Sequence, residues 1–221
     1  MVLVLFNGRP LTINWAQDHI QAIVEAWFPG SEAGHSISDV LFGDYNPSGK
    51  LSVTFPRSVG QIPIFYNHLN TGRPATPENK MMKYVSRYLD IDNSPLYPFG
   101  YGLSYTSFSY SAIDLSAKEI KTDGSITATV EVSNTGKMDG EEVVQLYIEK
   151  ASSPIARPMQ LKGFKKVSIP AGKSEKVSFD IGTEELSLYD INMRKIVETG
   201  SYNIYIGTSS VDYQKENLTV K

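Results

Sequence analysis

The sequence contains no cysteine, and this absence excludes several kinds of chemistry. Without a thiol the chain can form no disulfide framework, no cysteine nucleophile and no thiolate metal site. Histidine is nearly as scarce: His19, His35 and His68 lack the i, i+4 pairing and the neighbouring carboxylates that are typical of metal sites. We therefore expect surface or capping roles for the histidines and no bound metal.

Net charge and long apolar runs are also lacking. The formal charge of −3 gives no electrostatic reason to bind nucleic acid or an anionic membrane. No apolar run approaches the roughly 20 residues that a membrane-spanning helix needs. The Val2–Phe6 run is too short for a signal peptide and leads directly into the turn sequence Asn7–Pro10. Because the chain opens inside a strand pattern, we expect Met1 to begin a fragment rather than a natural mature protein.

What the sequence does contain is a change of texture around residues 95–110. This stretch is rich in aromatic residues, holds two prolines and two glycines, and carries no charge, so it fits neither a helix nor a regular strand. The pattern before it is α/β, and the pattern after it is all-β. We therefore divide the chain into an α/β portion (1–56), an irregular aromatic-rich connector (57–107) and a β-sandwich (108–221).

The α/β portion has the pattern of a few short elements. Val2–Phe6 predicts a strand buried on both faces of a largely parallel sheet, and Ile20–Trp27 is a second apolar segment of strand character. Ser31 is the expected N-cap of a short helix, which Gly43 would end in a left-handed conformation. Lys50–Phe55 predicts a third short strand. These elements are too few to enclose a complete core.

The connector is interrupted by several prolines, and long irregular connections of this kind are usually functional or linkers. A short helix near Asn79–Leu89 is the only regular element that we expect there. Rings and charges are mixed in this segment, a composition suited to ligand contact, although interdomain packing would also explain the aromatic residues. The candidates for contact at the rim of a substrate site are Tyr84, Arg87, Tyr88, Asp90 and Asp92.

From Phe108 onward, apolar and polar residues alternate with the period of half-buried strands. The alternating segments include 126–133, 143–148, 177–181 and 202–206, and glycine-containing turn sequences lie between them. About six or seven short strands within about 110 residues are typical of an immunoglobulin-like or fibronectin type III-like sandwich.

No complete catalytic motif occurs in the chain. Gly43–Lys50 differs from a phosphate loop in its spacing, and Leu51 replaces the hydroxyl residue that would bind magnesium. The serines near His35 lack a G-x-S-x-G elbow, which disfavours a serine hydrolase. Nothing in the spacing of acidic residues such as Glu32 and Asp39 places two carboxylates across a sugar, so we interpret them as solvated or capping groups.

Eight strings in order along the chain carry a family resemblance. They are VLFNGRPL (4–11), AWFPGSEAG (26–34), DVLFGDYNPSGKL (39–51), GQIP (60–63), PLYPFGYGLSYTSF (95–108), NTG (134–136), VVQLY (143–147) and LKGF (161–164). Together they resemble glycoside hydrolase family 3, and most of all its bacterial, periplasmic-type β-glucosidases.

The resemblance implies a protein with a catalytic TIM barrel, an α/β sandwich domain and a fibronectin type III-like domain. This chain would hold the end of the sandwich domain (1–56) and the whole of the last domain. Such enzymes are retaining and exo-acting, need no cofactor, and work in the periplasm or outside the cell on terminal β-glucosides. Their Asp nucleophile and Glu acid/base are expected upstream of residue 1. No residue here is therefore carried over as catalytic, and we expect the chain alone to be inactive.

Two alternatives remain open. The sandwich could recognise polysaccharide or a cell surface, in which case a row of exposed aromatic residues should lie on one strand face; the tyrosines after residue 108 are scattered instead. The chain could also be a structural or oligomer-forming module, because an incomplete sheet exposes apolar edges. On this basis we expect the chain to self-associate or to leave residues 1–56 poorly ordered.

Overall fold

The structure, a computed structural model, describes residues 1–69, 71–151 and 158–221. The chain divides into two compact units, each of which is described by itself. The first unit contains Met1–Asn46, Leu51–Tyr66 and residues 71–99, whereas the described parts of the second are Pro47–Lys50, 67–69 and the residues from Gly100 onward. No helix in these described ranges is long and apolar enough to cross a membrane.

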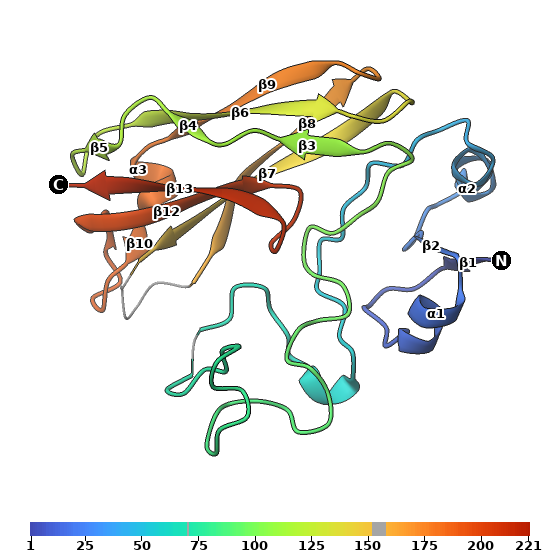
Figure 1. The fold of residues 1–221 in the computed structure, drawn as a ribbon, viewed down its shortest axis with the longest axis horizontal. Helices are drawn as coiled ribbons and strands as arrows, with labels where there is room; N and C mark the ends of the chain where they lie inside the picture. The colour runs from blue at the N-terminus through green and yellow to red at the C-terminus, as the bar shows by residue number, and fades with distance from the viewer. Residues whose placement is uncertain (70, 152–157) are drawn as a thin grey trace. The chain divides into compact units, whose positions relative to one another are not determined.

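The first unit begins with two short parallel strands (Figure 1). Strand β1 pairs with β2 with Val2 opposite Ala22, so the expected parallel pairing is confirmed. The helix after the second strand is also confirmed, and it ends at Gly43 with φ 87°. The bounds are β1 (Val2–Leu5), α1 (Asn14–His19), β2 (Ala22–Glu25), α2 (Ala33–Phe42) and the 3₁₀ helix η1 (Val59–Gln61).

Several local predictions for the first unit were wrong. The N-cap of α2 is Glu32 and not Ser31, and its side chain makes no capping hydrogen bond. The predicted burial of the first strand on both faces is not found, because Val2 is exposed and the remainder of β1 is only half-buried. Helix α1 was not predicted; its ring pair Trp15 and His19 stacks one turn apart, with centroids 4.8 Å apart.

Two further predictions were wrong. Lys50–Phe55 forms no strand, and its only β-bridge joins Phe55 to Tyr97. Residues 79–89 form turns instead of a helix. The backbone N–H of Lys80 donates to the Thr76 carbonyl at 2.9 Å, but the left-handed φ of 64° at Tyr84 prevents the helix from continuing.

The second unit is a two-sheet sandwich with a small additional hairpin (Figure 1), which confirms the predicted sandwich. The strand order of one sheet is β5-β13-β12-β7-β8; in the other, β3 and β4 pair with one edge of β6, and β9 pairs with β6 along most of its length. The bounds are β3 (Phe108–Tyr110), β4 (Asp114–Leu115), β5 (Glu119–Ile120), β6 (Ile126–Asn134), β7 (Gly140–Lys150), β8 (Gln160–Ile169), β9 (Ser174–Ile181), α3 (Thr183–Leu186), β10 (Leu188–Tyr189), β11 (Lys195–Ile196), β12 (Gly200–Gly207) and β13 (Tyr213–Val220).

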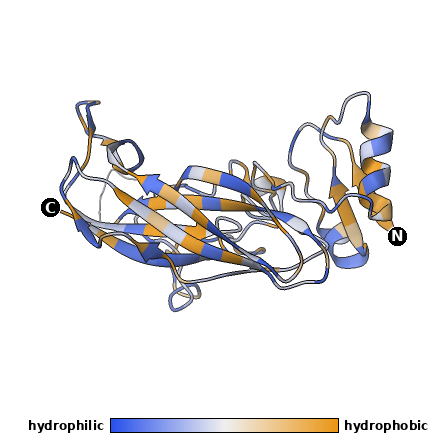
Figure 2. Ribbon diagram, turned by 90° about the horizontal axis from the view of Figure 1, so that it is seen from above, coloured by the Kyte–Doolittle hydropathy of each residue, from blue (hydrophilic) through white to orange (hydrophobic). Residues whose placement is uncertain are grey.

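The core of the sandwich lies between the two sheets and follows the predicted alternation. Along these strands, hydrophobic and hydrophilic residues alternate in Figure 2, as expected when one face of a sheet is buried. The central side chains of this core are Ala128, Val130, Val132, Val144, Leu146, Val177, Phe179, Ile181, Ile204, Ile206 and Leu218. Strand β7 departs from strict alternation, because Gln145 and Tyr147 on its other face are buried as well.

Candidate functional site

The five predicted rim residues lie in the 71–99 part of the first unit, where two segments run side by side. The backbone N–H of Ser86 donates to the carbonyl of Arg73 at 2.8 Å, and the Thr71 hydroxyl donates to the Ser86 hydroxyl at 2.8 Å. These bonds place the Arg73 guanidinium over the Tyr84 ring, 5.8 Å from its centroid. Tyr84 is 78% exposed and adopts a left-handed backbone with φ 64°, which is costly for a non-glycine residue.

The other rim candidates follow directly along the chain. An Asn93 amide accepts from the backbone N–H of Tyr88 and donates to the Ser86 carbonyl, so it holds the chain on both sides of Arg87. Tyr88 and Asp90 are exposed and Arg87 is half-buried. The segment therefore presents two rings, Tyr84 and Tyr88, on a backbone fixed by side-chain hydrogen bonds.

Asp92 is held differently from Asp90. Its carboxylate accepts from the backbone N–H of Ser94 at 2.8 Å. The backbone and hydroxyl of Ser94 are the main causes that lower the pKa of Asp92, with a smaller contribution from the Arg57 guanidinium. The backbone carbonyl of Asp92 also accepts from the buried amide of Gln61 at 3.0 Å. Asp92 is therefore ionised at neutral pH and is suited to accept hydrogen bonds, not to act as a general acid.

The remaining sequence candidates do not assemble into a second site. The exposed Glu32 pairs with His35 at 2.9 Å, and the exposed Asp39 lies on α2. In the part of the chain that the structure describes, no group of three histidine or acidic residues could hold a metal ion. What the segment 71–99 offers is exposed rings, a cation and acceptors, a set that can bind a sugar.

Sequence reasoning missed a charged cluster inside the second unit. The Lys50 ammonium lies 3.3 Å from a Glu142 carboxylate oxygen and donates to the Thr208 hydroxyl at 2.8 Å and the Gly102 carbonyl at 3.2 Å. The Tyr110 hydroxyl donates to the same carboxylate at 2.9 Å. Burial, and then the charge of Glu142, raise the pKa of Tyr110.

A signal for this cluster was present in the sequence. Glu142 shares its parity along β7 with Val144 and Leu146, so the alternation places a charge on the buried face. A buried carboxylate requires a partner, and Lys50 supplies it from a distant part of the chain. Because the side chains of both Lys50 and Glu142 are buried, we interpret the pair as structural.

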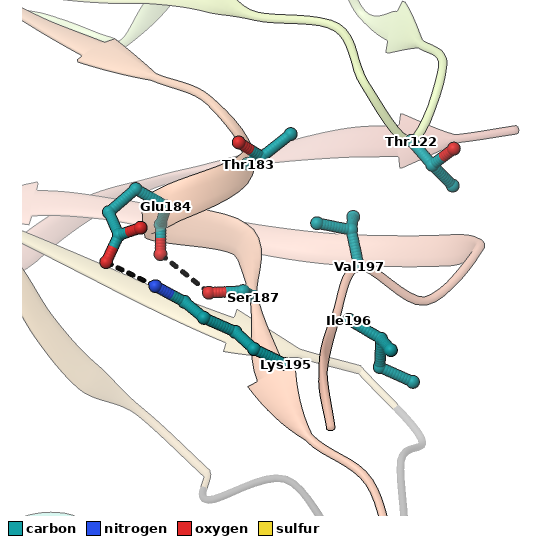
Figure 3. A pocket seen from close by; sticks show the side chains of 7 residues that line it. All are labelled: Thr122, Thr183, Glu184, Ser187, Lys195, Ile196 and Val197. Carbon is teal, nitrogen blue, oxygen red and sulfur yellow. Dashed lines mark hydrogen bonds and ion pairs between the residues drawn. The ribbon is translucent and has the colours of Figure 1, made fainter.

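The second unit also contains an open pocket of about 480 Å³ between α3 and the hairpin β10–β11 (Figure 3). The Glu184 carboxylate accepts from the Lys195 ammonium at 2.5 Å, and the Ser187 hydroxyl donates to the Glu184 carbonyl at 2.9 Å. The Glu184–Lys195 bond lowers the pKa of Glu184 and raises the pKa of Lys195. The pocket is lined by Thr122, Thr183, Glu184, Ser187, Lys195, Ile196 and Val197.

Comparison with known proteins assigns both units. The profile of the glycosyl hydrolase family 3 C-terminal domain matches residues 1–105, and that of the fibronectin type III-like domain matches residues 142–210. The chain belongs to glycoside hydrolase family 3. The resemblance found in the sequence and the expected fold class, an α/β portion followed by a fibronectin-like sandwich, are thereby confirmed.

Similar family 3 proteins are considerably longer than this chain. It is 53% identical to a periplasmic β-glucosidase of Salmonella typhimurium, over 95% of this chain and 28% of that protein. It is 40% identical to a β-xylosidase of Formosa agariphila, over 100% of this chain and 30% of the relative. The crystal structure of a Listeria innocua β-glucosidase in complex with isofagomine matches with a TM-score of 0.95 and 45% identity, over 99% of this chain and 31% of that one. The chain thus spans less than a third of these relatives and corresponds to their C-terminal domains.

Proposed function

We propose that this chain is the non-catalytic C-terminal part of a retaining, exo-acting β-glucosidase that releases terminal, non-reducing β-D-glucosyl residues. The observation that carries the proposal is the Salmonella match, which covers 95% of this chain but only 28% of the relative. Retaining hydrolysis needs two carboxylates about 5–5.5 Å apart across the sugar. The lowered pKa of Asp92 in the rim segment suits a hydrogen-bond acceptor and not the general acid that this chemistry also requires.

In this proposal the segment 71–99 borders a sugar site that the preceding part of the protein completes. Tyr84 and Tyr88 offer ring faces, while Arg87, Asp90 and Asp92 offer hydrogen bonds to sugar hydroxyls. Support comes from the strained backbone of Tyr84, since such conformations cluster at ligand sites. By analogy with the Salmonella relative, the protein would act in the periplasm or outside the cell.

The test compares hydrolysis of an aryl β-glucoside by the 221-residue chain with hydrolysis by a longer protein that includes the preceding segment of family 3. Only the longer protein should accelerate the reaction by the roughly 10⁶-fold or more that is expected of an enzyme. Turnover by the short chain, abolished by Asp90→Asn or Asp92→Asn, would refute the non-catalytic role. An aryl β-xyloside as second substrate tests the glucoside preference, because the Formosa relative is a β-xylosidase.

The rim contacts are tested in the longer protein. Tyr84→Ala should raise KM roughly two- to tenfold at nearly constant kcat, the expected loss of one aromatic contact made equally in ground and transition states. Phe164→Ala, at another exposed aromatic residue on β8, serves as the control. Equal KM values for Tyr84→Ala and the unchanged protein would remove Tyr84 from the site.

A further inference from the structure

The pocket beside the hairpin β10–β11 lies within the fibronectin-like unit and plays no part in the proposed glycosidase function. Its seven lining residues combine three hydroxyl groups, one ion pair and two aliphatic side chains (Figure 3). Its volume of about 480 Å³ falls within the roughly 300–1,000 Å³ typical of sites for small ligands. The question is which chemical class of ligand this lining would recognise.

The charges of the pocket argue against an ionic ligand. Lys195 is neutralised by Glu184 at 2.5 Å, so an incoming anion would have to break that pair. The neighbouring Glu185 carboxylate is occupied as well, because it accepts from the backbone N–H of Gly182 at 2.9 Å. A cation would therefore compete with the Lys195 ammonium at Glu184 and with the Gly182 N–H at Glu185. What remains is a neutral ligand that exchanges many hydrogen bonds.

Hydrogen-bonding capacity remains available at the pocket wall. In the described part of the chain, the hydroxyls of Thr122 and Thr183 form no hydrogen bond, and the Ser187 hydroxyl uses only its donor. Glu184 and Lys195 retain further acceptor and donor positions beyond the bond that joins them. Ile196 and Val197 provide an apolar surface beside these groups. Such a mixture matches a sugar ring, which presents hydroxyls at its edge and C–H groups on its faces.

An aromatic residue neighbours Lys195 just outside the residues that line the pocket. Tyr189 is directly opposite Lys195 in the antiparallel pair β10–β11, and side chains opposite each other in such a pair lie on the same face. Tyr189 is 59% exposed, so a face of its ring is accessible for stacking.

We propose that this pocket is a saccharide-binding site for a neutral pyranose unit of an oligo- or polysaccharide, with Tyr189 as the stacking platform and Thr183, Ser187 and the Glu184–Lys195 pair as hydrogen-bonding groups. Such a site would hold the protein on a glycan. It gives a specific location to carbohydrate binding by the sandwich, and it does not depend on whether the proposed glycosidase function is correct.

The experiment is a ¹H–¹⁵N NMR titration of the 221-residue chain with cellotetraose. The expected result is a saturable change, with a Kd in the range of about 1–10 mM, confined to the amides of Thr122, α3 and β10–β11. Tyr189→Ala should weaken binding roughly tenfold, and Ser187→Ala should weaken it less. Phe164→Ala removes an equally exposed ring elsewhere on the sandwich and should leave the Kd unchanged.

Any of four outcomes would overturn the proposal. The first is no saturable shift, and the second is a shift that maps to other strands. The third is an unchanged Kd for Tyr189→Ala, provided that this variant keeps the dispersed spectrum of a folded sandwich. A sulfated glucan that binds more tightly, with an affinity that falls as salt is added, would show an anion site and would equally refute a neutral ligand.

Discussion

Lys50 carries its charge into the interior of the second unit, where its side chain is 10% exposed and that of its partner Glu142 is 3% exposed. Removal of one member of such a pair leaves the other charge buried and uncompensated, at a cost of about 3–5 kcal/mol. Lys50→Met should therefore lower the free energy of unfolding by this amount in urea denaturation followed by circular dichroism. Thr208 and the Gly102 carbonyl would lose their donor in the same variant.

The matched control for this variant is Lys118→Met. Lys118 pairs with Glu216 at 3.6 Å on the surface, and exposed pairs contribute about 0–1 kcal/mol. The double variant Lys50→Met/Glu142→Leu should recover much of the lost stability, because no unpaired charge remains. Strictly additive losses in the double variant would show that the two charges do not stabilise each other.

Tyr202 makes the unfolding free energy depend on alkaline pH. Burial raises the pKa of Tyr202 to about 12, and its hydroxyl donates to the Glu198 carbonyl at 2.8 Å. Because the folded pKa lies above the unfolded value of about 10, the contribution is complete below pH 10 and is lost as pH rises toward 12. Stability measured in urea should fall by at most about 1.4 kcal/mol per pH unit for this phenol, and Tyr202→Phe should make the decline shallower. An equally steep decline in the variant would assign the effect to other groups, such as Tyr110.

At the scale of elements, the segment Pro47–Lys50 is held against residue 102 by close backbone contact. A Cβ atom placed on Gly102 would lie 2.2 Å from the Gly49 carbonyl oxygen, so a side chain there would force the two backbones apart. Gly102→Ala should destabilise the protein by about 1–3 kcal/mol in thermal unfolding. Gly34→Ala in α2 meets no atom within 4 Å and should instead stabilise its helix by up to about 1 kcal/mol. Equal effects of the two substitutions would contradict this steric explanation.

The elements that the sequence predicted best are those whose partners lie in the same unit. Alternation along β6, β9 and β12 placed the core residues correctly, because each of these strands buries one face against the facing sheet. The pattern failed at Lys50–Phe55, where backbone pairing and not side-chain period decided the outcome. The predicted helix at Asn79–Leu89 failed because Tyr84 adopts a left-handed φ of 64° and the backbone N–H of Ser86 bonds to the Arg73 carbonyl instead.

The candidate site was predictable only in part, because its contacts depend on pairing between separate segments of the chain. The mixture of rings and charges at Tyr84–Asp92 could be read from composition, but the contact between Arg73 and Tyr84 depends on hydrogen bonds made through Ser86. Likewise, the parity of Glu142 predicts a buried carboxylate without identifying Lys50, which is far away in sequence. The period of the apolar pattern identifies the buried face of a strand. The partner of a buried side chain, by contrast, depends on pairing between distant parts of the chain.

At the scale of the whole molecule, the first unit exposes large apolar side chains. Phe28 is 82% exposed, Phe42 81% and Trp15 67%, and Val2 and Phe6 of the β1 region are also exposed. Exposed apolar side chains of this kind, together with a short two-stranded sheet, favour association with another protein surface. We therefore expect the isolated 221-residue chain to self-associate.

Sedimentation velocity over a range of protein concentrations measures this association directly. The average mass should rise with concentration, and Phe28→Ser/Phe42→Ser should shift the equilibrium toward monomer, because the two rings are among the most exposed apolar groups of the first unit. Phe164→Ser/Val211→Ser removes apolar groups of 66% and 65% exposure from the second unit, and it should leave the association unchanged. A monodisperse monomer whose β1 amides are strongly protected from hydrogen exchange would show that the first unit is stable by itself, and that its apolar surface does not drive assembly at the concentrations studied.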